Sequence, residues 1–181
     1  MTLATVGHLP PPVPALPEHV AGWSLCPTGA GPVVGSAAFG GAPAGAVRAY
    51  AASTGHDGPQ VAHVTIHRVL HHPLRGCYPV GAHDLLLEVV TTAPQPPPPA
   101  DVPDPTALLG PLVAALFTAD PSCRRIMTAP AIEDTAAQER YAAGGFRPVA
   151  EADLHEGTVV LMVIEPVQVT TIATALDDMP H

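Results

Sequence analysis

Within residues 120–153, two apolar runs flank a stretch of helical character, and turn residues separate all three. Arg125–Thr128 predicts a short buried strand. Asp134–Ala143 predicts a helix that ends at the pair Gly144–Gly145, because glycine is the usual residue at a helix C-terminus. A second strand is expected at Val149–Asp153. A strand, a helix and a further strand in this order indicate an α/β domain.

Four segments earlier in the chain also have the apolar pattern of strands. In Val61–Leu70, Val64 and Ile66 alternate with polar residues, which is typical of a strand with one buried face. The near-continuous apolar run Leu85–Val90 predicts a central strand that is covered on both faces. The four expected strands are Trp23–Cys26, Ala46–Ala52, Val61–Leu70 and Leu85–Val90.

An amphipathic helix is expected to begin at Asp104–Pro105, since aspartate is a favoured N-cap and proline suits the first helical position. Apolar residues then recur at helical spacing and form one stripe that should face a core. Gly110–Pro111 should kink or restart this helix. A last strand is expected at Thr158–Ile164. The apolar stripe consists of Leu108, Leu109, Leu112, Val113, Leu116 and Phe117.

Proline makes up 24 of the 181 residues, far above its usual share. Many of these prolines fall in two runs, Pro10–Pro17 and Pro94–Pro105, which we expect to be extended and solvated. The sequence therefore divides into a Pro-rich arm (residues 1–20), one folded domain (residues 21–166) and a C-terminal tail (residues 167–181).

The net charge of −9 and the absence of lysine argue against a nucleic-acid partner or an anionic membrane, because phosphate contacts need clustered positive side chains. No stretch reaches the length of a membrane span, and the N-terminus lacks a secretory signal. Cys26, Cys77 and Cys123 lack the spacing of a zinc site or a disulfide framework. We expect free buried thiols in a soluble, cytoplasmic protein.

Four nearby histidines raise the hypothesis of a metal site, but distance argues against its simplest form. On a strand, His63 and His67 would share a face and lie about 13 Å apart. One ion with ligand bonds of about 2 Å cannot join them. We therefore expect no metal, and we expect His71–His72–Pro73 to form a turn.

Two motifs resemble the GNAT acyltransferases. The first is PSCRRIM at residues 121–127, followed by Pro130, a helix containing Tyr141, and GGFRPV at residues 144–149. The second is YPVGAHDLLLEVV at residues 78–90. Both are most similar to siderophore-biosynthesis enzymes of the mycobactin and aerobactin types, which acylate lysine or hydroxylysine side chains. The resemblance implies an α/β fold with a GNAT-like mixed central sheet flanked by helices and a shortened N-terminal helical region.

In GNATs this helix and its tyrosine flank the reacting thioester. The resemblance therefore implies that Tyr141 is the general acid that protonates the departing thiolate. It also implies a donor, acyl-CoA or acetyl-CoA, that lies along Val89, Val90 and Thr91, where backbone N–H groups stabilise the oxyanion. An acyl carrier protein is the alternative donor. The matching donor-site positions at the start of the helix are Asp134 and Ala137.

The general base is left open between two residues. His83 stands where the siderophore family has its proposed base, and a histidine is suited to accept a proton at neutral pH. Glu88, on the expected central strand, is the rival. A glutamate there could equally have a structural partner such as Arg125.

Three features depart from the family. Where GNATs have a Gly-rich loop for the CoA pyrophosphate, this chain has ADVPDP at residues 100–105, with two prolines and two carboxylates. Such a loop opposes CoA binding of the usual kind, because backbone donors are lost and like charges repel. Ala131 replaces an acidic residue of the siderophore family, and the segment between Trp23 and Ala46 is short.

The sequence therefore predicts an N-acyltransferase of siderophore-type specialised metabolism. It would move an acyl group from a thioester to a small-molecule amine or hydroxylamine. The alternative is a catalytically inactive GNAT-like protein that binds a partner or a small ligand. The altered loop and Ala131 favour the alternative, whereas Tyr141 and its helix favour the enzyme.

Overall fold

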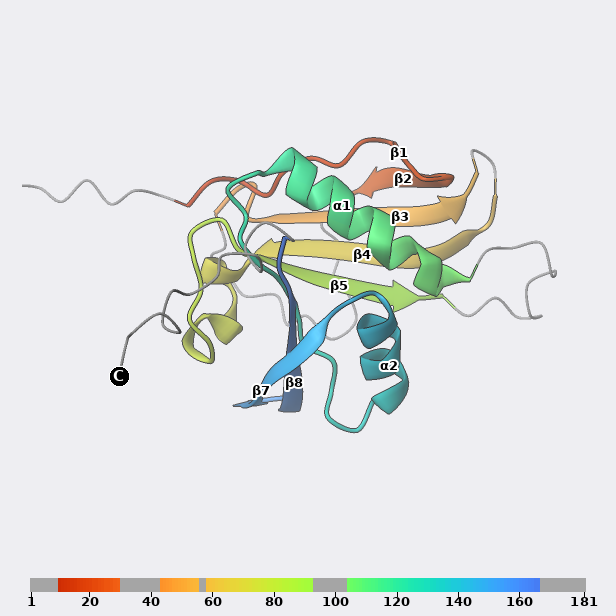
Figure 1. Ribbon diagram of the computed structural model, residues 1–181. Coiled ribbons are helices and arrows are strands. Elements are labelled where there is room, and N and C mark those ends of the chain that lie inside the picture. The colour runs from red at the N-terminus through yellow and green to blue at the C-terminus, as the bar shows by residue number, and fades with distance from the viewer. Residues whose placement is uncertain (1–9, 30–42, 56–57, 93–103, 167–181) are drawn as a thin grey trace, which may run out of the picture.

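The computed structural model describes residues 10–29, 43–55, 58–92 and 104–166. Within these residues, eight strands form one sheet in the order β1-β2-β3-β4-β5-β6-β8-β7 (Figure 1). Neighbouring strands are antiparallel except β5 and β6, which are parallel. This mixed sheet confirms the expected α/β class. The strands are β1 (His19–Val20), β2 (Trp23–Thr28), β3 (Val47–Thr54), β4 (Gln60–Arg68), β5 (Leu85–Thr91), β6 (Ile126–Thr128), β7 (Arg147–Leu154) and β8 (Gly157–Ile164).

Two α-helices lie against this sheet. Helix α1 (Leu109–Ala119) covers one face of its middle strands, and α2 (Thr135–Ala143) lies beside β5 and the β7–β8 hairpin (Figure 1). Short 3-10 helices occur at η1 (Val69–His71), η2 (Pro73–Gly76) and η3 (Pro105–Leu108). The histidines expected in a turn lie in and between η1 and η2.

The helical segment begins at Pro105, as the sequence predicts, but its first turn is the 3-10 helix η3. The Oδ1 of Asp104 accepts the N–H of Thr106 at 2.9 Å and so caps η3. The chain then becomes α-helical at Leu109, one residue before Gly110–Pro111. The predicted apolar stripe faces the sheet. Its buried members are Leu108, Leu109, Leu112, Val113 and Leu116, and Phe117 is half-buried.

Both faces of the middle strands are covered by protein. One core packs α1, η3 and α2 against the sheet, and the other packs η1 and η2 against β5, β6, β7 and β8. The prediction that β4 buries a single face is therefore wrong. Thr65 and His67 are buried as well, because the segment after β4 folds back over that face. The prediction for Leu85–Leu87, covered on both faces, is confirmed.

The first proline run packs against the domain, contrary to the expectation that it is solvated. Val13 is 1% exposed and Leu16 is 8% exposed. The N–H of Val13 donates to the carbonyl of Gly45 at 2.7 Å, and the N–H of Leu16 donates to the hydroxyl of Tyr50 at 3.0 Å. The physical reason is that these two apolar side chains have a site in the larger core. Most of the second proline run lies outside the described residues.

Candidate functional site

Strands β5 and β6 run side by side only at their amino ends. Their register pairs Leu85 with Ile126 and Leu86 with Met127, and no further pair joins the two strands among the described residues. Strand β5 nevertheless continues to Thr91, with β4 along its other edge. The carboxyl half of β5 therefore presents an edge that its parallel neighbour does not cover.

Alternate N–H groups of a strand point to opposite sides, and this alternation decides which donors reach the open edge. The N–H of Leu85 points toward β6, where it meets a carbonyl at 3.1 Å. The N–H of Thr92 points toward β4, where it meets a carbonyl at 2.9 Å. By the same alternation, the N–H groups of Val89 and Thr91 face the opening. That of Val90 faces β4.

Helix α2 places Tyr141 at this open edge. The helix is fixed at its start by Asp134, whose Oδ1 accepts the N–H of Ala137 at 2.9 Å. It ends at Gly144–Gly145, as predicted, where Gly145 adopts a φ of +93° that suits glycine. The buried ring of Tyr141 stands edge-on to Phe146, with 5.5 Å between ring centroids.

The hydroxyl of Tyr141 accepts a hydrogen bond from a backbone N–H group that faces the opening. The N–H of Val89 donates to Tyr141 Oη at 3.0 Å, and Thr128 is a second hydrogen-bond partner of this hydroxyl. Burial raises the pKa of Tyr141 above its usual value, although the hydrogen bonds with Thr128 and Val89 act against the shift. The phenol therefore keeps its proton at neutral pH.

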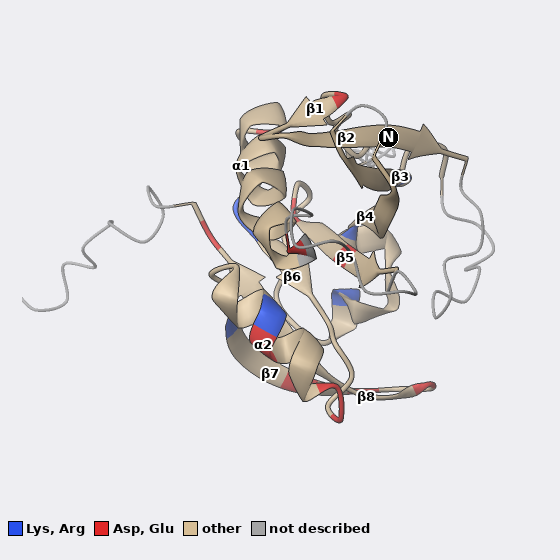
Figure 2. Ribbon diagram, turned by 90° about the vertical axis from the view of Figure 1, so that its right-hand side faces the viewer, with Lys and Arg blue, Asp and Glu red and all other residues tan. Residues whose placement is uncertain are grey.

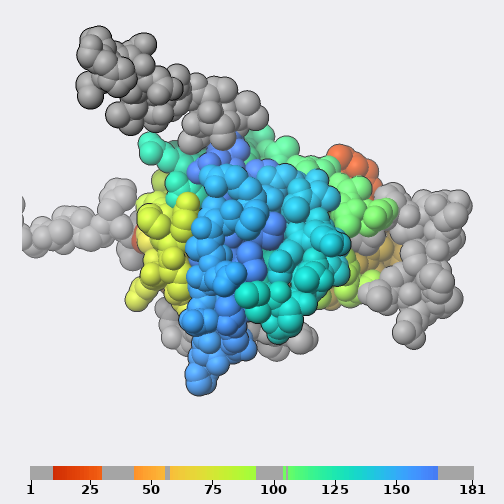
Figure 3. Space-filling view, turned by 60° about the horizontal axis from the view of Figure 1, so that its bottom comes forward, coloured from red at the N-terminus to blue at the C-terminus, as the bar shows by residue number. Residues whose placement is uncertain are grey.

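A cavity of about 630 Å³ opens at this place. Its walls come from β5, the segment after β6, α2, the β7–β8 hairpin and η2. Figure 3 looks onto the face where the hairpin (blue) lies between the η1–η2 segment (yellow) and α2 (teal). The sequence-predicted residues that line the cavity are Glu88, Val89, Val90, Thr91, Asp134, Ala137 and Tyr141.

The cavity wall is rich in carboxylates. In Figure 2, acidic residues (red) occur at the turn before α2 and at the tip of the β7–β8 hairpin. Arg140 is the one arginine among the residues that line the cavity, and no lysine exists in the chain. The field of this wall therefore favours a cationic guest. The acidic lining residues are Glu88, Glu133, Asp134 and Glu156.

Glu88 has two imidazole neighbours that sequence reasoning did not assign to the site. Its Oε2 lies 3.6 Å from Nε2 of His67 on β4. The ring of His72 stands edge-on to that of His67, with centroids 5.3 Å apart, and His72 also lines the cavity. Burial, helped by the nearby His67, lowers the pKa of His72 to about 4, and Glu88 acts against this shift. His72 is thus neutral at neutral pH.

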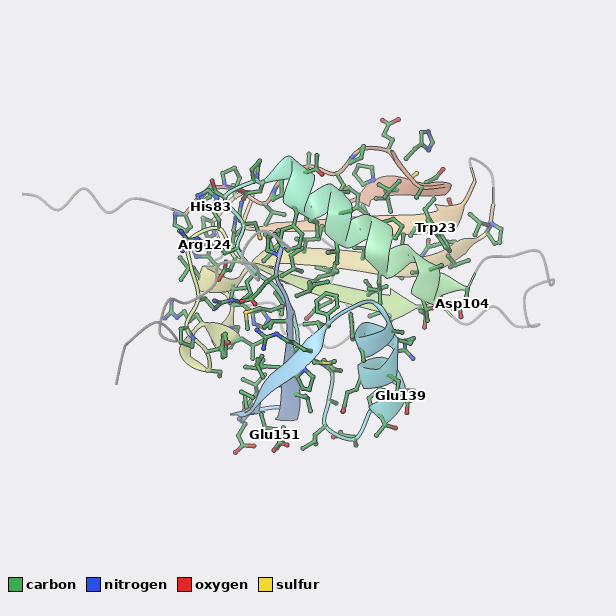
Figure 4. The ribbon with its side chains drawn as sticks, viewed as in Figure 1. Trp23, His83, Asp104, Arg124, Glu139 and Glu151 are labelled. Carbon is green, nitrogen blue, oxygen red and sulfur yellow. The ribbon has the colours of Figure 1, made fainter. Side chains whose placement is uncertain are left out.

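The structure does not bring His83 to the cavity. His83 precedes β5, and Figure 4 shows it near Arg124, at the end of the sheet opposite Asp104. Its Nδ1 lies 3.0 Å from Oδ1 of Asp120, which in turn pairs with Arg68 at 2.7 Å. Strand β5 rises about 3.3 Å per residue, so Leu85 is already about 13 Å from Val89.

The structure describes only parts of the three features that depart from the family. Residues 100–103 of the altered loop, and residues 30–42 of the short N-terminal region, lie outside the described residues. Asp104 caps η3 as stated above. The backbone of Ala131 pairs with Val159 of β8, and its carbonyl accepts the side-chain amide of Gln138 at 2.9 Å. Glu133, a few residues on, does reach the cavity.

The remaining expectations concern metal, membrane and thiols. No group of three or more His, Cys, Asp or Glu residues in the described part of the chain is arranged to hold a metal ion. Among the described helices, none has the length and apolarity to cross a membrane. All three cysteines are free, but only Cys123 is buried, so the expectation of three buried thiols is wrong. Cys26 is exposed because it lies in the second half of β2, which β1 does not pair with.

Comparisons with known proteins agree with this fold. The family model of the acetyltransferase (GNAT) domain matches residues 37–154. No curated protein matches the chain. The structure is similar to aminoglycoside acetyltransferase AAC(6')-Ib in complex with coenzyme A and kanamycin, at 20% identity and a TM-score of 0.53, over 66% of this chain and 67% of that one.

Two further solved structures are similar at the same level. Mycobacterium smegmatis RimJ, in complex with CoA-disulfide, has 20% identity and a TM-score of 0.51, over 68% of this chain and 55% of that one. An uncharacterised protein from Bacillus halodurans has 20% identity and a TM-score of 0.54, over 66% of this chain and 59% of that one. At this identity, the three likenesses show the fold.

Proposed function

The chain belongs to the GNAT acetyltransferase family, and from that premise we propose that its cavity joins an acyl thioester to an amine or hydroxylamine. The observation that carries the proposal is the meeting of Val89 N–H and Tyr141 Oη at 3.0 Å where β5 leaves β6. Glu88 lies one residue away and lines the same cavity. An oxyanion donor, an acid and a base are thus available within one site.

The N–H of Val89 is the oxyanion donor in this proposal. It points into the opening, and a thioester carbonyl would replace the hydroxyl that it now contacts. A backbone donor held in a strand needs no reorganisation as negative charge develops on the carbonyl oxygen. Thr91 carries the next N–H on the same side and can bind a further polar group of the donor.

Glu88 is the general base. Its side chain is 31% exposed and lines the cavity, so an acceptor nitrogen can reach it. As the nitrogen attacks the thioester carbon, its proton passes to the carboxylate. His83 has no part in this step, because it pairs with Asp120 and does not line the cavity.

Tyr141 is the general acid. Its raised pKa keeps the phenol protonated, so it can give its proton to the thiolate as the carbon–sulfur bond breaks. The acceptor nitrogen loses a proton and the sulfur gains one, so the overall transfer is balanced. The phenol recovers its proton from solvent after the thiol leaves.

The acceptor is a cationic amine or a hydroxylamine. The carboxylates around the cavity support a positively charged acceptor. The aminoglycoside acetyltransferase with the same fold was solved with kanamycin, itself an amine. The motif resemblance narrows the acceptor to a lysine or hydroxylysine side chain of siderophore-type metabolism. Three free cysteines support a reducing compartment such as the cytoplasm.

Acetyl-CoA or a longer acyl-CoA is the first donor to test. Solved structures of this fold contain coenzyme A, which supports that choice. The carboxylate of Asp104 accepts the N–H of Thr106 at the start of η3, which is where GNATs bind the CoA pyrophosphate. A thioester on an acyl carrier protein has no CoA pyrophosphate to place at this position. It is therefore the second donor to test.

The experiment is a transfer assay that measures thiol release from acetyl-CoA, longer acyl-CoAs and an acyl carrier protein. N-alkylhydroxylamine and a lysine-like amine serve as acceptors. We expect turnover with at least one donor and a loss of about 100-fold or more in Glu88→Gln. Glu139→Gln is the matched control, since Glu139 is exposed on α2 and does not line the cavity. Absence of both thiol release and donor binding would leave only a protein that binds another ligand.

A further inference from the structure

His67 carries a buried nitrogen without a hydrogen bond. The residue is 9% exposed, and its Nε2 has no solvent contact and no hydrogen-bond partner among the described residues. Buried polar atoms in native proteins are nearly always paired, and an unpaired one needs a physical explanation, of which a catalytic role is one. This nitrogen lies 3.6 Å from a carboxylate oxygen of Glu88, which lines the cavity, so proton transfer is the role to test.

The nitrogen faces the proposed base. In the β4–β5 register His67 pairs with Leu86 and Thr65 pairs with Glu88, so His67 and Glu88 are diagonal neighbours on one face. Their Nε2 and Oε2 atoms are 3.6 Å apart, beyond hydrogen-bond distance. A carboxylate only accepts hydrogen bonds, so a hydrogen on Nε2 would draw the two atoms closer. A proton can pass from Glu88 to Nε2 only in the tautomer that carries the ring hydrogen on Nδ1.

The second imidazole does not compete for a proton. His72 Nδ1 accepts the N–H of Leu74 at 3.3 Å, so a proton there would displace the contact that caps η2. Burial also lowers the pKa of His72 to about 4, as described above. A proton that leaves Glu88 toward the protein interior therefore reaches His67.

The chemistry of a cationic acceptor creates a need for such a step. An ammonium group must lose one proton to become a nucleophile, and its nitrogen must lose another as the amide forms. Tyr141 gives one proton to the thiolate but accepts none from the nitrogen. The carboxylate of Glu88 holds one proton at a time. It must therefore release the first proton from the nitrogen before it can accept the second.

We propose that Nε2 of His67 takes the first proton from Glu88, which frees the carboxylate to accept the second. This inference rests on the proposed function. The first proton moves from nitrogen to Glu88 Oε2 and then to His67 Nε2, and the second moves from nitrogen to Glu88. After the product leaves, Glu88, whose side chain is 31% exposed, releases its proton to solvent, and the imidazolium then returns its own proton through Glu88. No electrons are exchanged, and no other reactant is needed. His67 acts through Glu88 and touches no substrate atom.

The groups that face this pair define its pH response. Glu88 faces His67 from β5, His72 faces it from the η1–η2 segment, and Tyr141 of α2 interacts with Glu88. On β3, the partner of His67 is Val47, which does not titrate. The other titratable groups that line the cavity are Glu133, Asp134, Arg140, His155 and Glu156.

Two acceptors test the relay. A lysine-like amine enters as a cation and must lose two protons, whereas an N-alkylhydroxylamine is largely neutral at neutral pH and must lose one. In His67→Asn we expect kcat/KM for the amine to fall about 100-fold, with the acid limb of its pH profile moved to higher pH. Activity with the hydroxylamine should change little. His63→Asn is the control, since His63 is exposed on the same face of β4.

Several results would overturn the relay. One is an unchanged amine profile in His67→Asn, and another is an equal loss with both acceptors, which would mean that His67 only supports the fold. If the wild-type protein transfers to neither acceptor, the proposed function and the relay fail together. A measurement on the wild-type protein avoids the risk of an unfolded variant. Nitrogen-15 NMR of the labelled histidine ring should show hydrogen on Nδ1 of His67, and hydrogen on Nε2 alone would exclude the relay.

Discussion

Tyr141 and Val89 are 52 positions apart in the sequence, yet a single hydrogen bond joins them at the floor of the cavity. The same two groups are proposed to serve the reaction separately, one as acid and the other as oxyanion donor. In the ligand-free protein each satisfies the other, so neither is left as an unpaired buried group. A thioester must break this hydrogen bond to bind, and this cost reduces its net binding free energy.

Replacement of Tyr141 by phenylalanine should therefore separate binding from turnover. We expect kcat to fall about 100-fold, because the thiolate loses its acid. The dissociation constant for acyl-CoA should fall as well, because the Val89 N–H becomes free for the carbonyl. The dissociation constant for CoA should stay the same, because CoA has no carbonyl group at this position. Calorimetry and stopped-flow thiol release measure these quantities.

Tyr78→Phe is the control for that comparison, since Tyr78 lies near Arg125 and does not line the cavity. An unchanged kcat in Tyr141→Phe would show that the thiolate leaves without a protein acid. A weaker affinity for acyl-CoA would show that the tyrosine helps to bind the donor, instead of competing with it.

Among the elements, α2 supplies both the proposed acid, Tyr141, and a small residue of the cavity wall, Ala137. It is only nine residues long, and Ala137 is the smaller of its two buried residues. Ala137 is buried and lines the cavity, while Ala136 next to it is exposed. The helix is fixed at one end by Asp134 and at the other by Gly145, so its inner face cannot shift easily to accept a larger side chain.

A leucine at position 137 should therefore block the site. We expect Ala137→Leu to reduce acyl-CoA affinity at least 10-fold, because the added atoms occupy cavity space in which the donor is expected to bind. The substitution should also lower stability by about 1–3 kcal/mol through overpacking. Ala136→Leu, one position away on the same helix, should leave both quantities near wild type. Thermal melting with and without ligand measures them. Equal ligand affinity in the two variants would place the donor elsewhere.

At the scale of the whole molecule, a buried charge cluster joins parts of the chain that are distant in sequence. Arg68, 1% exposed, pairs with Asp120 after α1 and donates to the carbonyls of Pro11 and Pro12 in the N-terminal run. It also donates to the carbonyl of His83. One guanidinium thus ties the proline run, β4, the start of β5 and the end of α1 together. His83, proposed from sequence as a base, is one member of this cluster.

Asp120 should make the stability of the molecule sensitive to acid. Burial alone would raise the pKa of Asp120, but hydrogen bonds from Arg68 and His83 outweigh it and hold the pKa below its usual value. A carboxyl group with a lowered folded-state pKa stabilises the fold above its unfolded pKa of about 4 and loses that contribution as the pH falls through the folded value. Urea unfolding at several pH values measures the free energy of unfolding.

We expect Asp120→Asn to be less stable than wild type near neutral pH, with a difference that shrinks below about pH 4. Glu151→Gln, an exposed change on β7, should show no such difference. A stability gap between Asp120→Asn and wild type that is the same at every pH would show that shape, rather than charge, accounts for the role of Asp120.

Local patterns in the sequence were sufficient for most of the elements, but not for β1, which lies in the segment expected to be a Pro-rich arm. Apolar alternation, the Asp104 and Asp134 caps and the glycine pair after Ala143 predicted the strands and helices, because these signals depend on neighbours a few residues away. The motif around Tyr141 predicted the GNAT fold, which the family match confirms. The siderophore acceptor stays a prediction.

Local sequence patterns could not predict contacts between segments that are far apart in the chain. Strand register sets His67 beside Glu88, and the early parting of β5 from β6 brings Val89 to Tyr141. The burial of Val13 likewise depends on a core that the whole chain must build. Packing over long separations decides such contacts, and a shift of one residue in a strand would turn every side chain to the other face. The sequence therefore left His83 and Glu88 as alternative bases, and folding placed only Glu88 in the cavity.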